Sequence, residues 1–192
     1  RDAGQILKGF EITDSISDGL LKIDGKITGT GFKEVTTTNI LIENFGVKDA
    51  PLFTQILNAT SLVGLVNTLR GKGIRFQTLR ADVDFTANKI EIKDSFASGT
   101  SLGVSTEGAI DRNSDQISIK GMIVPAYILN RIIDQIPVVG RILTGGKKEG
   151  LLAAEYLISG TKDEPEVSVN PLTAFTPGFL RAFVKATRKP LE

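Results

Sequence analysis

Short segments in which apolar and polar residues alternate recur along this sequence, and they limit its possible folds more than any other feature. Leu21, Ile23, Gly25 and Ile27, for example, alternate with charged neighbours. A period of two predicts strands with one buried and one solvated face, and the Gly, Asn and Asp residues between segments are typical of antiparallel hairpins. Further strands are predicted at 39–47, 74–85, 90–92, 102–106, 117–123, 152–159 and 166–169.

The predicted strand at 74–85 changes the phase of its alternation. Apolar residues occupy positions 74 and 76, and then positions 79, 81, 83 and 85. A slip of one residue would turn side chains to the opposite face unless the strand carries an extra residue at the slip. We therefore predict a bulge or bend near Gln77-Thr78.

Other segments have the apolar spacing of helices. Residues 51–70 form two such pieces, with Thr60-Ser61 placed to cap the second, and a short helix is expected at 2–8. Residues 125–143 have helical spacing that Pro137 breaks or kinks, and residues 177–187 have an apolar side and a basic side. The predicted fold class is α+β: a curved, mostly antiparallel sheet with amphipathic helices packed on one side or capping its end.

The length of 192 residues suits one domain. We expect residues 1–190 to form that domain, in a piece of something larger, and Leu191-Glu192 to be a vector-derived remnant. The net charge of +1 and the lack of a basic-aromatic stripe argue against nucleic acid as a partner. No stretch approaches the roughly 18 consecutive apolar residues of a membrane span.

The absence of both His and Cys restricts the chemistry open to the chain. Without them there is no Ser-His-Asp or Cys-His catalytic machinery, no disulfide and no cysteine or histidine metal site. Gly140–Lys147 fails as a phosphate-binding loop on spacing, and Asp82 with Asp84 fits the solvent side of an amphipathic strand. We therefore expect no enzyme, no metal and no cofactor.

Several motifs resemble the C-terminal region of AsmA-like proteins, most of all the larger YhdP-type members. They are Val-Pro-Ala-Tyr-Ile-Leu-Asn at 124–130, Ile-Pro-Val-Val-Gly at 136–140, Leu-Thr-Gly-Gly at 143–146, Val-Ser-Val-Asn-Pro-Leu at 167–172 and Thr-Pro-Gly-Phe-Leu-Arg at 176–181. The residues that carry the resemblance include Pro125, Tyr127, Asn130, Pro137, Gly140, Gly145, Gly146, Asn170, Pro171, Pro177 and Gly178.

The resemblance implies a periplasmic domain of a larger, inner-membrane-anchored protein in a Gram-negative bacterium, similar to TamB. It also implies transport of phospholipid, or another acyl lipid, between the inner and outer membranes through an apolar β-groove. It supplies no catalytic residues. The side chains expected to line the groove are Ile74, Phe76, Leu79, Val83, Phe85, Ile90, Ile92, Leu102, Val104, Ile117 and Ile119.

Residues in the last predicted helix are candidates to face a membrane or an envelope protein partner, because apolar and basic side chains occur together there. They are Phe179, Leu180, Arg181, Phe183 and Lys185. Packing of this helix on the core with a basic outer face is the alternative.

Two other functions stay open. A structural or docking module of the cell envelope would have helices that close the groove, and would bind no lipid of its own. An enzyme based on carboxylates or lysine would need ionisable groups that converge in one pocket. If Phe76, Val83 and Ile92 line an open groove, charged substitutions there would reduce lipid capture without unfolding the domain.

Overall fold

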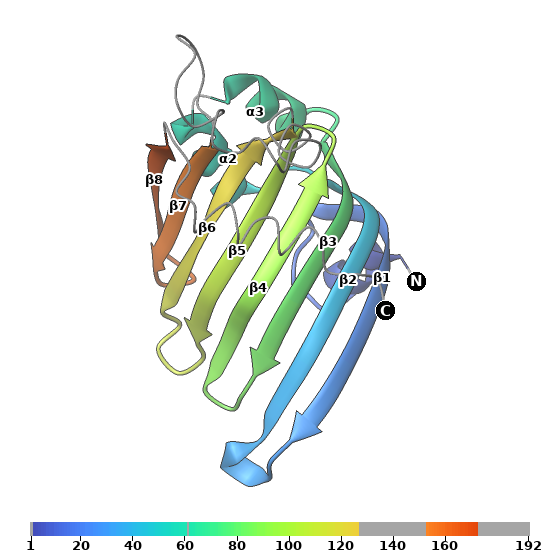
Figure 1. Cartoon of the computed structure of the whole chain (residues 1–192), viewed down its shortest axis with the longest axis vertical. Helices are drawn as coiled ribbons and strands as arrows, with labels where there is room; N and C mark the ends of the chain where they lie inside the picture. Colours follow the sequence, from blue (N-terminus) through green and yellow to red (C-terminus); the bar gives the residue numbers. More distant parts are fainter. Residues whose placement is uncertain (1, 61, 127–152, 173–192) are drawn as a thin grey trace, which may run out of the picture.

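One antiparallel sheet dominates the computed structural model, which describes residues 2–60, 62–126 and 153–172 (Figure 1). Its strands lie in chain order, so each strand pairs with the next one along the chain. They are β1 (Ile16–Thr28), β2 (Val35–Val47), β3 (Ile74–Phe85), β4 (Lys89–Gly99), β5 (Leu102–Asp111), β6 (Ile117–Pro125), β7 (Ala153–Gly160) and β8 (Pro165–Leu172).

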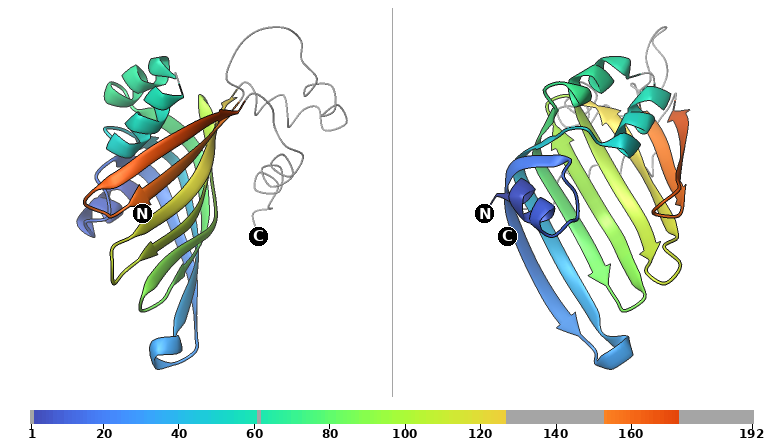
Figure 2. Two further views of the ribbon diagram at one scale, coloured as in Figure 1. Left: turned by 90° about the vertical axis from the view of Figure 1, so that its left-hand side faces the viewer. Right: turned by 180° about the vertical axis from the view of Figure 1, so that it is seen from behind.

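Helices interrupt this meander at its start and between β2 and β3. They are α1 (Ala3–Gly9), α2 (Pro51–Ala59) and α3 (Val63–Arg70), with a short 3₁₀ helix, η1 (Gly31–Lys33), at the β1–β2 turn. The three α-helices of the described residues lie on one side of the sheet, toward which the sheet curves (Figure 2). Because α2 contacts β8 although it follows β2 in the chain, the α2–α3 segment spans one end of the sheet. The predicted α+β class, with a curved antiparallel sheet and helices on one side, is confirmed.

The pairing register gives the sheet two chemically different faces. Leu21, Ile42, Leu79, Ala97, Val104, Ile123 and Ala154 are successive cross-strand partners from β1 to β7. We call the face that carries this row the apolar face, and it is the face that the helices cover in part. Charged side chains such as Lys22, Arg80 and Glu155 stand on the opposite side, which we call the polar face. It also carries buried apolar side chains, namely Phe96, Met122 and Val124.

The core lies between the apolar face and the helices. Leu57 and Leu69, from α2 and α3, are completely buried in one cluster with Ile74 and Leu102 from the sheet. The aromatic rings of Phe45 and Phe76 stack there with their centroids 5.3 Å apart. Burial of these side chains supplies the main hydrophobic stabilisation of the domain.

The predicted phase change in β3 is confirmed. The β3–β4 register shifts between Phe76 and Thr78, so that Gln77 is the extra residue of a bulge. The irregularity continues into β2, where Asn44 adopts a positive φ of 57°. Asn44 lies between Glu43 and Phe45, whose partners on β3 are Thr78 and Phe76. Both Phe76 and Leu79 therefore stay on the apolar face.

The helix predictions have mixed outcomes. The helix expected at 2–8 is present as α1, which Asp2 caps by accepting a hydrogen bond from the Gln5 N–H at 2.9 Å. The two helical pieces expected at 51–70 are α2 and α3. The capping role given to Thr60 is wrong, because Leu62 precedes α3 and the Thr60 hydroxyl donates to the Leu57 carbonyl at the end of α2.

Two predicted helices fall largely or wholly outside the described residues. Pro125 is the last residue of β6, so a strand ends where the sequence predicts a helix to begin. Residues 127–143 of that predicted helix, and the whole of 177–187, lie outside the described part. None of the helices in the described ranges combines the length and the apolar character that crossing a membrane requires.

Candidate functional site

All the side chains expected to line a groove lie on the apolar face. The register pairs Leu79 with Ala97, Val83 with Ile92 and Phe85 with Ile90. It then pairs Leu102 with Pro125, Val104 with Ile123 and Ile110 with Ile117. The structure therefore brings these residues, which come from four strands, onto one continuous surface.

This surface has a closed part and an open part. Ile74, Phe76 and Leu102 are buried in the core cluster that includes the α2 and α3 side chains, and Val83 is buried as well. Ile74, Phe76 and Leu102 are therefore sealed in the core, whereas Val83 is buried outside that cluster, beside its strand partner Ile92. Charged substitution at Phe76 or Val83 is expected to unfold the domain, contrary to the expectation for an open groove. The other seven are only partly buried: Leu79, Phe85, Ile90, Ile92, Val104, Ile117 and Ile119.

The open part lies at the end of the sheet away from α2 and α3. One row of cross-strand partners there consists of Ile27, Thr36, Phe85, Ile90, Ile110 and Ile117. The helices α2 and α3 join the opposite ends of β2 and β3, next to Val47 and Ile74. The apolar face thus continues beyond the helices that cover its other end (Figure 2).

Two further apolar residues belong to this surface although they were not among the predicted groove residues. Ile23 pairs with Ile40, and Ile27 pairs with Thr36, so both are on the apolar face of β1. Their side chains are 56% and 64% exposed. The alternation in β1 was the available signal, since it places Ile23 and Ile27 in phase with Leu21.

A buried tyrosine places a hydroxyl group on the apolar face. The Tyr156 hydroxyl donates to the Ser105 carbonyl at 2.9 Å and lies 2.6 Å from Thr106 Oγ1. Burial raises the pKa of Tyr156 to about 12, although the hydrogen bond with Thr106 opposes this rise. The hydroxyl therefore stays neutral at physiological pH and has partners for its hydrogen bonds, which suits a structural role.

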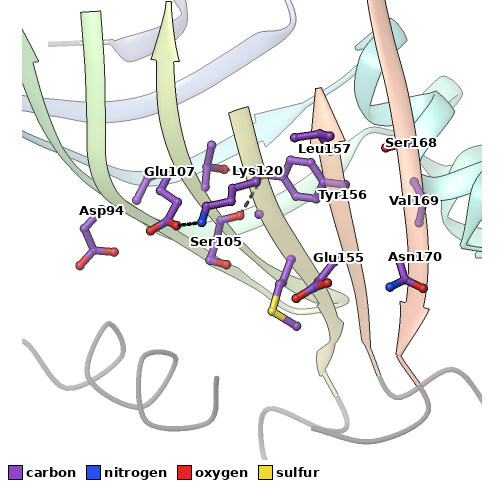
Figure 3. Close-up of a pocket in the computed structure, with 14 residues that line it drawn as sticks. Asp94, Ser105, Glu107, Lys120, Glu155, Tyr156, Leu157, Ser168, Val169 and Asn170 are labelled. Atoms are coloured by element: carbon purple, nitrogen blue, oxygen red, sulfur yellow. Dashed lines mark hydrogen bonds and ion pairs between the residues drawn. The ribbon is translucent and has the colours of Figure 1, made fainter. Parts of the chain in front are cut away.

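The polar face contains a cavity of about 580 Å³ over β4 to β8. Its lining includes Asp94, Glu107, Lys120, Glu155 and Asn170 (Figure 3). The Lys120 Nζ lies 2.8 Å from a Glu107 carboxylate oxygen, and this contact raises the pKa of Lys120. A lysine held protonated in this way is a poor nucleophile or general base, so its charge state gives no support to lysine-based catalysis.

Asp84, one of the two aspartates that the sequence places on the solvent side of its strand, and Asp111 also lie on the polar face. Asp84 forms an ion pair with Lys93, and this contact is the main cause that lowers the pKa of the Asp84 carboxyl. Asp111 accepts hydrogen bonds from the N–H groups of Asn113 and Ser114, as expected of a turn. Within residues 2–60, 62–126 and 153–172, no cluster of acidic side chains is arranged to hold a metal ion.

Few of the residues that carry the family resemblance are described. Pro125 ends β6, while Asn170 and Pro171 are in β8, paired with Glu155 and Ala154. The others, Tyr127, Asn130, Pro137, Gly140, Gly145, Gly146, Pro177 and Gly178, lie outside the described residues, as do the membrane- or partner-facing candidates Phe179, Leu180, Arg181, Phe183 and Lys185.

Comparison of the chain with protein-family models, with curated proteins and with solved structures gave no match.

Proposed function

We propose that this chain is a non-catalytic domain that binds the acyl chains of phospholipids on the open part of its apolar face. The observation that supports this most strongly is the extent of that face. Apolar side chains continue across β1 to β6 beyond the helices, and Ile90, Ile110 and Ile117 there remain partly exposed. An exposed apolar surface of this kind is typical of a site for an apolar ligand or partner.

The physical chemistry of such binding is simple. Transfer of an acyl chain from water to an apolar surface is favourable by about 0.8 kcal/mol for each buried methylene group. The face offers mainly branched aliphatic side chains, so it recognises the shape and hydrophobicity of a chain and not its headgroup. The headgroup would stay in water at the rim, which agrees with a site that needs no charged residue among its apolar lining.

The sequence resemblance to AsmA-like proteins supports the wider setting of this proposal. In that setting the domain is periplasmic, belongs to an inner-membrane-anchored protein and takes part in phospholipid transport to the outer membrane. The curvature of the sheet toward the apolar face fits a surface that partly surrounds an acyl chain. A structural or docking module is the second candidate, and the sealed side chains Ile74, Phe76 and Leu102 favour it at the helix-covered end.

Lipid uptake by the purified chain tests the proposal. The protein is purified without detergent, incubated with phosphatidylethanolamine–phosphatidylglycerol vesicles, separated from them by gel filtration and examined by native mass spectrometry and organic extraction. We expect stoichiometric phospholipid that remains bound through gel filtration. A mass that corresponds to protein alone, before and after incubation, would contradict lipid binding and favour the docking module.

Two matched variants locate the site. Ile117→Lys places a charge on the open part of the apolar face and is expected to reduce bound lipid at least tenfold. Leu157→Lys is the control, because Leu157 is 43% exposed but lies on the polar face, next to Tyr156 in β7. Circular dichroism and thermal melting show whether both variants are folded. Equal lipid uptake by the two folded variants would exclude the apolar face as the binding surface.

A further inference from the structure

We propose that the free edge of β1 pairs with the same edge of a second copy, so that two sheets join into one. This inference is independent of lipid binding. Every residue from Lys22 to Thr28 is exposed, and in the described part of the chain the inner edge of β1 pairs with β2. Such an edge presents unpaired backbone N–H and C=O groups, which form a template for another strand.

The two sheet edges differ in how they are protected. The edge strand β8 is short and contains Pro165 and Pro171, which cannot donate to a further strand. The edge strand β1 has 13 residues and no proline. An isolated bridge between Asp2 and Leu20 covers its beginning, and the turn at Gly29 ends it. The free segment therefore runs from Lys22 to Thr28, and its midpoint is Gly25.

An antiparallel pairing with its two-fold axis at Gly25 is self-complementary on both faces. Residue 23 then lies opposite residue 27 of the second copy, which pairs the exposed Ile23 and Ile27 side chains on the apolar face. Residue 24 lies opposite residue 26, which pairs Asp24 with Lys26 on the polar face. Cross-strand pairs of apolar residues and of opposite charges both stabilise a sheet.

The charges of this segment are available for that pairing. Neither Asp24 nor Lys26 forms an ion pair within the described residues, whereas Lys22 nearby is bound to Glu43 at 3.2 Å. The two-fold axis brings each free carboxylate to a free ammonium group, twice in each dimer. A symmetric pairing of one surface patch with itself is the usual form of a homodimer interface.

Molar mass in solution is the first test. Light scattering coupled to gel filtration is expected to give twice the 20.6 kDa of one chain, with the monomer appearing on dilution. Asp24→Lys alone and Lys26→Asp alone each place like charges opposite one another, so each variant is expected to be monomeric. The double variant Asp24→Lys/Lys26→Asp restores opposite charges and is expected to dimerise again, as is an equimolar mixture of the two single variants.

Single cysteines test the register, because the natural chain has no cysteine. A Cβ at Gly25 has no heavy atom within 3.4 Å, so Gly25→Cys fits the strand. Directly opposed residues have Cα atoms about 4.5–5.5 Å apart, which a disulfide can span, so this variant is expected to form a disulfide-linked dimer on oxidation. In a dimer of Ile23→Cys, the two introduced sulfurs lie about 13 Å apart, because residue 23 of one copy is opposite residue 27 of the other, so this variant is not expected to cross-link. A mixture of Ile23→Cys and Ile27→Cys places the two cysteines opposite each other and is expected to cross-link.

The results separate this pairing from other arrangements. A chain that stays monomeric at all concentrations overturns the proposal and leaves the edge for a strand of a different kind. A dimer whose stability is unchanged by both charge variants, or whose Gly25→Cys form does not cross-link, also overturns it, because the contact then lies elsewhere. Recovery of the dimer in the double variant cannot arise from a general effect of either substitution on folding.

Discussion

Tyr156 and Thr106 are in hydrogen-bond contact, 2.6 Å apart, although β6 separates their strands. The contact exists because the Tyr156 ring lies over Gly121, its partner in the middle strand, where a side chain would otherwise stand. The Tyr156 hydroxyl also donates to the Ser105 carbonyl, so the Thr106 hydroxyl is the donor in the contact between the two side chains. One side chain thus ties β7 to β5.

Removal of this hydroxyl is expected to destabilise the domain moderately. Tyr156→Phe keeps the ring but leaves the Thr106 hydroxyl and the Ser105 carbonyl without this partner. A hydrogen bond of this kind contributes about 1–2 kcal/mol to the free energy of unfolding. Urea denaturation followed by circular dichroism measures the change. A variant as stable as the natural chain would show that the hydroxyl is not held as the structure describes.

Alkaline pH is expected to weaken the fold through the same residue. The pKa of Tyr156 is raised to about 12 in the folded chain, against 10.0 for an unperturbed tyrosine. Between these values the unfolded chain loses a proton that the folded chain keeps, so stability falls as the pH rises from about 10 to 12, by up to about 3 kcal/mol. Urea midpoints across this range should fall less steeply for Tyr156→Phe. Identical slopes for the two proteins would contradict the assignment.

Substitution of Gly121 is expected to be more damaging than loss of the hydroxyl. A Cβ at this position would lie 2.0 Å from the Ser105 carbonyl oxygen and 2.4 Å from the Tyr156 hydroxyl. The first of these atoms belongs to the backbone, so the strands themselves would have to move apart. We expect Gly121→Ala to cost about 3 kcal/mol or more. Gly25→Ala is the matched control, because its Cβ fits, and its thermal midpoint should change little.

The alternation of the sequence was sufficient to predict most strands because each strand has one buried and one solvated face. The prediction at 74–85 matches β3 at both ends, and the slip at Gln77 was visible because it interrupts that alternation. The start of β2 was missed by four residues. Val35 to Thr38 is rich in Thr and lacks apolar alternation, although β-branched residues favour strands.

The candidate site could be predicted only in part, for reasons of long-range geometry. Alternation placed the groove residues on a common face, but it carried no information about which of them the helices cover. Phe76 and Phe85 look equivalent in the sequence, and only Phe76 is buried, because α2 and α3 adjoin that end of β3. The contact of α2 with β8 joins segments more than 100 residues apart, beyond the reach of any local pattern.

Acid is expected to weaken the fold through Asp84. Its pKa is lowered from 3.8, first by the contact with Lys93, so the folded chain favours the ionised carboxylate. The contribution of the ionised Asp84 carboxylate to the free energy of unfolding is complete above the pKa of the unfolded chain. It is lost as the pH falls below about 4 and passes through the lower pKa of the folded chain. Thermal midpoints between pH 5 and 2 should therefore fall less steeply for Asp84→Asn. Asp163→Asn, in the exposed β7–β8 turn, is the control and should follow the natural chain.

Alanine substitutions in the buried core and at an exposed apolar residue are expected to have very different effects on the free energy of unfolding. Leu69 is completely buried against α2 and the sheet, so Leu69→Ala leaves a cavity and is expected to cost about 2–5 kcal/mol. Ile12 follows α1 and is 66% exposed, so it buries little apolar surface. Ile12→Ala should therefore change the free energy of unfolding by less than about 0.5 kcal/mol.

Urea denaturation of the two alanine variants supplies the comparison. A small effect of Leu69→Ala would mean that α3 does not seal the helix-covered end, and the groove would then extend to Ile74 and Phe76. A large effect would confine any bound acyl chain to the part of the apolar face beyond the helices. The length available for a ligand therefore depends on how firmly α3 packs, which this pair of variants measures without any lipid present.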